Sequence, residues 1–281
     1  MTEKSRKNPR SVIPGFGLTM GFTLVFLSLV VLIPLSTILL KTSSLSWGQF
    51  VAIITDERVI AAYTLTLTVA FSAAIVNVVF GVVISWVLIR YDFPGRKILD
   101  GLIDLPFALP TAVAGISLTA IYAPNGLIGG LLNPLGISVA YAPLGIVIAL
   151  VFIGLPFVVR TVQPVIQEFD KEVEEASVCL GACRWTTFRK VIFPQLLPAI
   201  LTGFALALAR GIGEYGSVIF ISGNMPYATE VVSLLIMSRL EQFDYTGATA
   251  IALVMLMTSF VILLTVNLIQ WYAARFTHER K

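Results

Sequence analysis

The chain has 281 residues, of which 57% are hydrophobic and only 12% are charged, and its mean hydropathy is +0.91. Soluble domains are nearer half apolar and a quarter charged. The composition therefore excludes a disordered chain, a nucleic-acid-binding protein and an ordinary cytosolic enzyme, and it predicts a polytopic membrane protein whose surroundings are the lipid bilayer.

Long stretches without charged residues predict the membrane spans, because a helix needs about 20 mostly apolar residues to cross a bilayer. The charge-free run between Asp104 and Arg160 is too long for one helix, and turn residues at 123–126 and 133–134 divide it into two. Barrel strands would alternate apolar and polar residues, whereas these stretches are apolar on nearly all faces. We therefore predict an all-α protein with six transmembrane helices, at residues 16–40, 61–89, 100–122, 143–164, 196–221 and 248–273.

The basic residues fall mainly on one side of these predicted spans. When successive loops are assigned to alternate sides, 15 of the 19 lysines and arginines lie on one side. The positive-inside rule then places both termini in the cytoplasm. The predicted organisation is a cytoplasmic tail at 1–15, a membrane domain at 16–274 and a second cytoplasmic tail at 275–281. A basic N-terminus also suits a signal peptide, but the first apolar run is too long and no cleavage site follows it.

Few residues that could perform catalysis or bind a metal are present. The single histidine is His278, and the two cysteines, Cys179 and Cys183, supply only two potential ligands. We therefore expect no catalytic residue and no metal site. The phosphate loop GxxxxGK[ST] does not occur either. If transport uses ATP, another chain must bind the nucleotide, and this chain is not an enzyme by itself.

The longest predicted cytoplasmic segment, 165–195, contains signals for two short helices. Asp170 can cap the first helix and Gly181 can end it. A second amphipathic stretch covers 185–192, and Pro194 separates it from the fifth span. Two short helices at a glycine bend form a knob that can dock in a groove of a partner protein. A helical hairpin at the membrane surface is an equally good interpretation of these residues.

Part of this segment follows a spaced pattern: Glu175-Ala176-Ser177, three residues, Gly181, nine residues, then Val-Ile-Phe-Pro ending at Pro194. It resembles the EAA motif of ATP-binding-cassette (ABC) importer permeases, which reads Glu-Ala-Ala, three residues, Gly, nine residues, Ile-x-Leu-Pro. The three departures from this pattern keep size or apolarity. The resemblance implies a type I importer permease fold, in which residues of 165–195 form a coupling loop that sits in a cleft of the ATPase subunit. These residues are Glu175, Ala176, Ser177, Gly181 and Pro194.

Further stretches resemble permeases of oxyanion importers, and of sulfate/thiosulfate importers of the T type in particular. They are 104–115, 160–165, 209–217, 219–224 and 242–252. The resemblance implies a permease subunit of the bacterial inner membrane that transports sulfate or thiosulfate. The implied partners are a homologous second permease subunit of the W type, two ATP-binding cassette subunits and a periplasmic sulfate/thiosulfate-binding protein. ATP and Mg would bind to the cassette subunits, and no cofactor is implied for this chain.

Arg210 and Glu214 are the charged residues deepest in a predicted span. Charged groups there are unfavourable, and the spacing of four residues puts both on one helix face, where they can pair. In one interpretation Arg210 attracts an anion, or the pair breaks and re-forms during transport. In the other, the pair is structural and faces a subunit interface. Asp100 and Asp104, at the start of the third span, favour a structural role because they would repel sulfate.

Several prolines and glycines are predicted to interrupt spans 3 and 4, as in transporters whose broken helices line the pathway. They are Pro106, Pro110, Gly115, Pro156 and Pro164. Hydroxyl and amide side chains near such breaks suit a transient dianion better than a fixed positive cluster. The candidate translocation residues are Thr111, Ser117, Ser217, Ser222 and Asn224, together with Arg210 and Glu214.

Other functions remain to be compared with this one. A molybdate or tungstate permease would share the Arg-x-x-Gly-Glu pattern at 210–214, but 223–226 and 243–245 favour sulfate. A secondary anion transporter with inverted repeats would show an internal repeat and more intramembrane acids than Glu214. An intramembrane enzyme would need catalytic residues that the sequence lacks.

Overall fold

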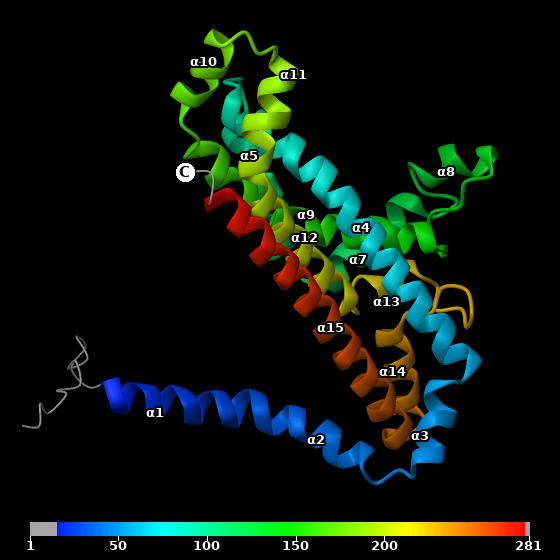
Figure 1. Cartoon of the computed structure of the whole chain (residues 1–281). Helices are drawn as coiled ribbons and strands as arrows, with labels where there is room; N and C mark the ends of the chain where they lie inside the picture. Colours follow the sequence, from blue (N-terminus) through cyan, green and yellow to red (C-terminus); the bar gives the residue numbers. More distant parts are fainter. Residues whose placement is uncertain (1–15, 279–281) are drawn as a thin grey trace, which may run out of the picture.

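The computed structural model describes the backbone of residues 16–278 and the side chains of residues 16–271, and its regular structure over that range is helical. Figure 1 shows an elongated bundle of helices with a long arm leading away from it. The predicted tail 1–15 and the last three residues of the predicted C-terminal tail lie outside the described residues.

Five helical segments are long and apolar enough to cross a bilayer within the described part of the chain. Three are single uninterrupted helices: α4 (Glu57–Arg90), α9 (Pro143–Gln167) and the last segment, described below. The segment Phe16–Thr42 combines α1 (Phe16–Leu27), a π turn (Ser28–Leu32) and α2 (Ile33–Thr42). The segment Arg184–Ile212 combines α11 (Arg184–Thr187), a π turn (Phe188–Ile192) and α12 (Phe193–Ile212). The fifth is α15 (Tyr245–His278), whose span runs to Trp271. These segments correspond to five of the six predicted spans.

The predicted third span, 100–122, is interrupted at its prolines, as the sequence predicts, but not at Gly115, which lies inside a helix. It consists of α5 (Arg96–Ile103), α6 (Leu105–Ala108) and α7 (Thr111–Tyr122). Leu109 adopts an extended conformation (φ −84°, ψ 134°), because the residue before a proline is disfavoured in the helical region. The twelve residues of α7 reach about 18 Å, which is short of a hydrocarbon core of about 30 Å. The predicted third span therefore corresponds to a set of short helices, none of which is long enough to cross a bilayer alone.

Two other predicted boundaries differ from the structure. The predicted span 196–221 is divided, because α12 ends at Ile212 and the short α13 (Val218–Ile221) follows after a break. Pro156 and Pro164, predicted to interrupt the fourth span, lie inside the continuous helix α9. A proline removes only one helical hydrogen bond, so a long packed helix tolerates it.

Pro194 does not separate the second short helix of 165–195 from the fifth span, as the sequence predicted. The helix continues from Arg184 to Ile212 through the π turn that ends at Ile192. The first membrane segment has the same arrangement, with the π turn Ser28–Leu32 followed by Pro34. A proline has no N–H for the carbonyl four residues earlier, and a π turn is one way to rearrange the bonds around that loss. The helix therefore changes from α-type to π-type hydrogen bonds just before Pro194 and continues past it.

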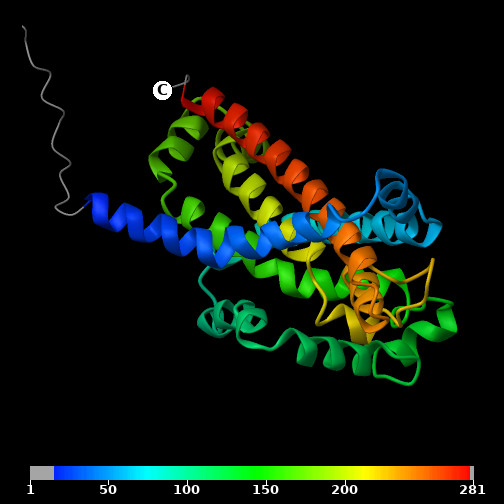
Figure 2. The same cartoon turned by 90° about the horizontal axis from the view of Figure 1, so that it is seen from below.

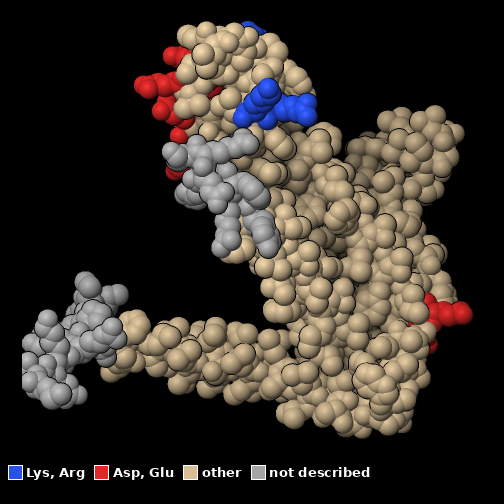
Figure 3. Space-filling view, viewed as in Figure 1, with Lys and Arg blue, Asp and Glu red and all other residues tan. Residues whose placement is uncertain are grey.

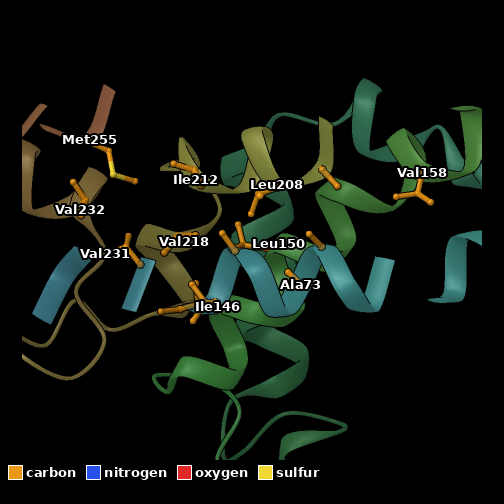
Figure 4. Close-up of a cluster of buried hydrophobic side chains, with 14 of the residues drawn as sticks. Ala73, Ile146, Leu150, Val158, Leu208, Ile212, Val218, Val231, Val232 and Met255 are labelled. Carbon is orange, nitrogen blue, oxygen red and sulfur yellow. The ribbon is translucent and has the colours of Figure 1, made fainter. Parts of the chain in front are cut away.

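The core of the bundle is made by α4, α9 and α12, which pack on one another along their lengths. Figure 4 shows its buried apolar side chains, among them Leu150, Leu208 and Ile212. The helices approach closely because glycines face bulky neighbours. A Cβ on Gly81 would lie 2.7 Å from Val158 Cγ1, and one on Gly203 would lie 2.8 Å from Val158 Cα. Small residues at helix contacts are typical of membrane bundles.

The shorter helices gather at the two ends of the bundle. In Figure 1, α10 (Lys171–Cys179), α11 and α5 lie at one end of the bundle. The opposite end carries α3 (Trp47–Ile54) and α14 (Val232–Glu241), and α8 (Gly129–Leu132) with the 3-10 turn Asn133–Leu135 projects to one side. The bundle therefore holds the loop 165–195 at one end and the loops around α14 at the other.

The arm in Figures 1 and 2 is the segment Phe16–Thr42. Helix α1 and its π turn have no buried residue, and Thr42 is the only buried residue of α2. Large apolar side chains are exposed on all faces of the arm. Contact with the rest of the described chain comes mainly from α2, which packs on α15.

Candidate functional site: the loop 165–195 and the break after the fifth span

Helix α10 of the loop 165–195 begins and ends where the sequence predicts. Asp170 Oδ1 accepts a hydrogen bond from the Glu172 N–H at 3.0 Å, so it caps the helix N-terminus. At the other end Gly181 has φ +81°. The Ala182 N–H donates to the Ser177 carbonyl at 3.1 Å and the Gly181 N–H to the Val178 carbonyl at 2.9 Å, which is the Schellman pattern. A defined glycine bend therefore joins α10 to α11.

A shallow hollow of about 370 Å³ lies between α10 and the following helix, beside part of the EAA-like pattern. Ala176 and Ser177 line it, and Ser177 Oγ lies 3.0 Å from Thr187 Oγ1. Glu175 is exposed. Two large apolar side chains are also exposed here, Leu180 by 89% and Trp185 by 68%. Figure 3 shows acidic groups on the outer side of this end of the molecule and a basic patch beside them.

Both cysteines of the chain lie at the glycine bend and both are exposed. The Thr186 hydroxyl lies 3.2 Å from Cys183 Sγ, and this hydrogen bond lowers the pKa of the Cys183 thiol below its ordinary value. Among the described residues no group of three or more His, Cys, Asp and Glu side chains could hold a metal ion.

An ion pair ties α10 to the membrane bundle. Arg90, the last residue of α4, pairs through Nη2 with the Glu174 carboxylate. The Arg90 guanidinium lies over the Trp86 ring at 4.9 Å and near the Phe169 ring at 5.8 Å. Phe188 also packs edge-on against Trp86, with the ring centroids 5.9 Å apart. The loop is thus fixed to α4 and continuous with α12. The sequence analysis missed this contact, because Arg90 and Glu174 carry no local signal that links them.

Asp100 and Asp104 have a structural partner in Arg160 of α9. Arg160 donates to both oxygens of Asp104 at 2.8 and 2.7 Å, and Arg160 Nη1 donates to Asp100 Oδ1 at 2.8 Å. The Gln163 amide also donates to Asp100 at 2.9 Å. This network fastens the broken third span to α9. A structural role was expected for the two aspartates, but Arg160 was assigned only to the basic side of the membrane.

Arg210 and Glu214 form the expected ion pair, at the end of α12 and just beyond it. The Glu214 side chain is buried, and its Oε1 accepts hydrogen bonds from the Ser217 N–H at 2.9 Å and the Ser217 hydroxyl at 3.1 Å. The Ser233 hydroxyl of α14 donates to the Glu214 carbonyl at 2.7 Å. The break 213–217 is therefore held by side chains, and the role of the pair in transport stays a prediction.

Helix α7 packs on this break. A Cβ on Gly115 would lie 2.4 Å from the Ser217 carbonyl oxygen, and one on Gly216 would lie 2.2 Å from Thr111 Oγ1. Thr111, Ser217 and Glu214 are thus brought together. Ser222 and Asn224 lie in the next loop, where Ser222 Oγ accepts from the Asn224 N–H at 3.2 Å. Ser117 is exposed on α7.

A second buried ion pair lies at the opposite end of α4, and sequence reasoning did not predict it. Arg58 donates to both carboxylate oxygens of Glu230 at 2.7 Å each, and Glu230 is 2% exposed. The Val232 N–H donates to Thr66 Oγ1 at 2.9 Å beside it. These bonds hold the loop before α14 on α4.

Residues 77–278 match the family model described as the inner membrane component of binding-protein-dependent transport systems. The chain belongs to this family. The match begins inside α4 and includes every candidate site residue, so the coupling-like loop and the break after α12 are parts of a transport-permease domain.

The relatives of this transport-family chain include sulfate permeases. It is 50% identical over 261 residues to the sulfate transport system permease protein CysT of Salmonella typhimurium, covering 93% of this chain and 94% of that protein. The same values hold for the Escherichia coli CysT protein. A probable sulfate permease protein of Nephroselmis olivacea is 48% identical, with 89% of this chain and 88% of the relative covered.

Solved ABC importers share the fold of this transport-family member. A bacterial importer of the acidic polysaccharide alginate superimposes with a TM-score of 0.76 at 16% identity, covering 92% of this chain and 96% of that one. The inward-facing MetNI methionine transporter gives a TM-score of 0.56 at 17% identity, covering 76% and 95%. The fold is that of an ABC importer permease.

Proposed function

We propose that the chain is a permease subunit of an ABC importer that carries sulfate, and thiosulfate with it, across a bacterial inner membrane. The 50% identity to sulfate permeases across 93% of the chain carries this proposal. The sulfate-like stretches 223–226 and 243–245 lie inside the aligned family domain. Molybdate or tungstate transport is disfavoured by the same comparison.

The loop 165–195 is the proposed coupling loop, which docks on an ATPase subunit. Its defined bend and the exposed Leu180 and Trp185 offer a rigid apolar surface to a partner. The Arg90–Glu174 pair and the continuous helix Arg184–Ile212 connect this surface to α4 and α12. A push on the loop is thereby transmitted to two membrane helices. ATP and Mg bind to the two cassette subunits, and their closure supplies the push.

The break after α12 is the proposed position of the translocation machinery. Thr111, Ser217 and Glu214 meet where two broken helices cross, and backbone groups freed at such breaks suit a transient anion. Arg210 pairs with Glu214 in this state, which keeps a permanent positive charge from holding the dianion. Release of Arg210 in another state would expose that charge to the anion.

The proposed topology has six spans, with α5, α6 and α7 together forming the third, and both termini in the cytoplasm. The charge distribution supports it, because 15 of the 19 basic residues fall on the side of the coupling loop. The arm Phe16–Thr42, in which only Thr42 is buried, needs lipid or protein around it, and the proposed second permease subunit of the W type would supply part of that cover. A periplasmic sulfate-binding protein delivers the substrate on the opposite face.

Uptake of radiolabelled sulfate tests the proposal. The chain, expressed with its partner subunits in a strain that lacks its own sulfate importer, should restore ATP-dependent uptake. Excess unlabelled thiosulfate should compete with the label. Uptake of molybdate without sulfate would contradict the proposal and favour the molybdate alternative.

A further inference from the structure

A cavity of about 780 Å³ lies between the end of α4, the start of α5 and the end of α9, away from the α12 break. Its wall carries charges of both signs. They belong to Asp92, Arg96, Lys97, Asp100 and Arg160. The loop that forms its rim directly follows an apolar span and opens with Tyr91, which is 58% exposed. A tyrosine at the end of a span is typical of the membrane–water interface.

An apolar groove of about 380 Å³ adjoins this cavity and shares Leu88 and Phe93 with it. The groove runs between α4 and α5, and Val87, Leu99 and Leu102 are partly exposed along it. A charged hollow at the interface that continues into an apolar groove between membrane helices has the two-part chemistry of a phospholipid, a polar headgroup and an acyl chain.

The charges of the cavity select the type of headgroup. Asp100 is occupied by Arg160 and Gln163. Arg96 Nη1 donates to Asp92 Oδ1 at 2.8 Å, and the Asp92 side chain is almost fully exposed. Lys97 is exposed and has no ion-pair partner among residues 16–271. The Lys97 ammonium and the Asp92 carboxylate, which is paired with Arg96 through Oδ1 only, are therefore both accessible in the wall of one cavity, which complements a zwitterion better than a purely anionic lipid.

We propose that this cavity and groove bind one aminophospholipid, a phosphatidylethanolamine, with its phosphate at Lys97 and Arg96, its ammonium at Asp92 and an acyl chain along Leu99 and Leu102. The first turn of α5 has no side-chain cap, so its backbone N–H groups add to the positive side of the site. The lipid stabilises α5, the first piece of the broken third span. The assignment to the cytoplasmic leaflet rests on the proposed orientation, and the site itself does not.

Lipid retention measured by native mass spectrometry tests the site. The whole transporter complex is reconstituted with equal amounts of phosphatidylethanolamine, phosphatidylglycerol and phosphatidylcholine and then delipidated. Wild-type complex should retain phosphatidylethanolamine above the other two, because the choline trimethylammonium cannot donate a hydrogen bond to Asp92 and the glycerol headgroup has no cation. Asp92→Asn should remove the preference for phosphatidylethanolamine over phosphatidylcholine.

Two variants address the two halves of the site. Lys97→Ala should lower phosphatidylethanolamine retention about fivefold, the loss expected for one basic contact to a headgroup. Leu102→Trp fills the groove from a partly exposed position and should lower retention to a similar degree. The matched controls are Lys171→Ala on α10 and Leu264→Trp on α15, both also exposed, and they should leave phosphatidylethanolamine retention unchanged.

Three outcomes would overturn the proposal. Retention of phosphatidylglycerol above phosphatidylethanolamine would mean that the basic residues act alone. Equal retention of all three lipids, unchanged in the variants, would mean ordinary annular lipid. Loss in only one of the two variants would contradict a single site built from both hollows. Sulfate uptake by the same complexes reports the proposed function separately.

Discussion

Gly181 shows how one residue sets the shape of the proposed coupling loop, 165–195. Its φ of +81° is unfavourable for any residue with a Cβ, and no atom lies within 4 Å of where a Cβ would stand. Gly181→Ala should therefore act through the backbone alone, destabilising the bend by about 1 kcal/mol. Proline cannot reach this φ, so Gly181→Pro should abolish the bend. We expect stimulated ATP hydrolysis and sulfate uptake to fall moderately with alanine and almost completely with proline.

Gly48→Ala is the matched control, because Gly48 also has free space but lies in helix α3 without a positive φ. It should leave both activities unchanged. If Gly181→Pro leaves complex assembly and stimulated ATP hydrolysis intact, the coupling role of this loop is wrong.

Residue-level features were predictable where the signal is local. Asp170 and Gly181 act on backbone groups within a few residues, so the sequence alone predicts their roles correctly. Other residues with positive φ escape this reasoning. Tyr141 has φ 62°, and its N–H donates to the Ile221 carbonyl at 2.7 Å. A bond between distant loops holds that conformation, and no sequence pattern around Tyr141 records it.

At the scale of elements, the Arg90–Glu174 pair couples α4 to α10. Glu174→Gln keeps the size of the side chain but leaves the partly buried Arg90 without its counter-charge. ATP hydrolysis should continue while the sulfate taken up per ATP falls about fivefold, as a loss of about 1 kcal/mol in the contact implies. The measurement is the ratio of uptake to ATP hydrolysis in proteoliposomes.

The charge-swapped double variant Arg90→Glu with Glu174→Arg should recover part of this ratio, but not all of it, because the cation over the Trp86 ring is lost. Glu172→Gln, on an exposed residue of the same helix, is the control and should have no effect. If the double variant does not recover the uptake-to-hydrolysis ratio and the Glu172→Gln control also lowers it, the effect belongs to helix α10 in general and not to the ion pair.

The presence of the membrane helices could be predicted from composition, whereas the points at which they are interrupted could only partly be predicted. Five predicted spans correspond to long apolar segments because length and apolarity suffice to specify them. The sequence correctly predicted that prolines interrupt the third span, whereas it wrongly predicted that the helix ends at Pro194. Pro110 ends the helix at Leu109, where no packed helix holds the chain in a helical conformation. Pro194 is instead accommodated by the π turn that precedes it. Proline shows where a helix lacks a bond, and the surrounding packing decides whether the helix ends there.

For the whole molecule, α4 carries an ion pair at each end: Arg58–Glu230 at its start and Arg90–Glu174 at its close. Arg58→Met would leave the Glu230 carboxylate buried and unpaired, which should destabilise the protein by about 3 kcal/mol. We expect a lower midpoint of thermal unfolding for the variant in detergent. Combining it with Glu230→Leu removes the orphaned charge and should restore most of the loss.

Arg96→Met provides the comparison, because the Arg96–Asp92 pair has an almost fully exposed carboxylate. It should change the free energy of unfolding by less than about 1 kcal/mol. A double variant as unstable as Arg58→Met alone would show that the stabilisation comes from the arginine side chain and not from the neutralisation of Glu230.

The π turns have a consequence for how the membrane helices are aligned with their surroundings. Each one adds a residue to a turn, so the helix after it is rotated by about 100° relative to an uninterrupted α-helix. Deleting a single residue from Phe188–Ile192 would restore regular winding and preserve the span. It would also rotate α10 and the rest of the proposed coupling loop about the axis of α12, so that they face away from Arg90. The direction in which the loop faces thus depends on one additional residue. A helical wheel drawn continuously through residues 188–192 would place the residues before or after this turn on the wrong face of the helix.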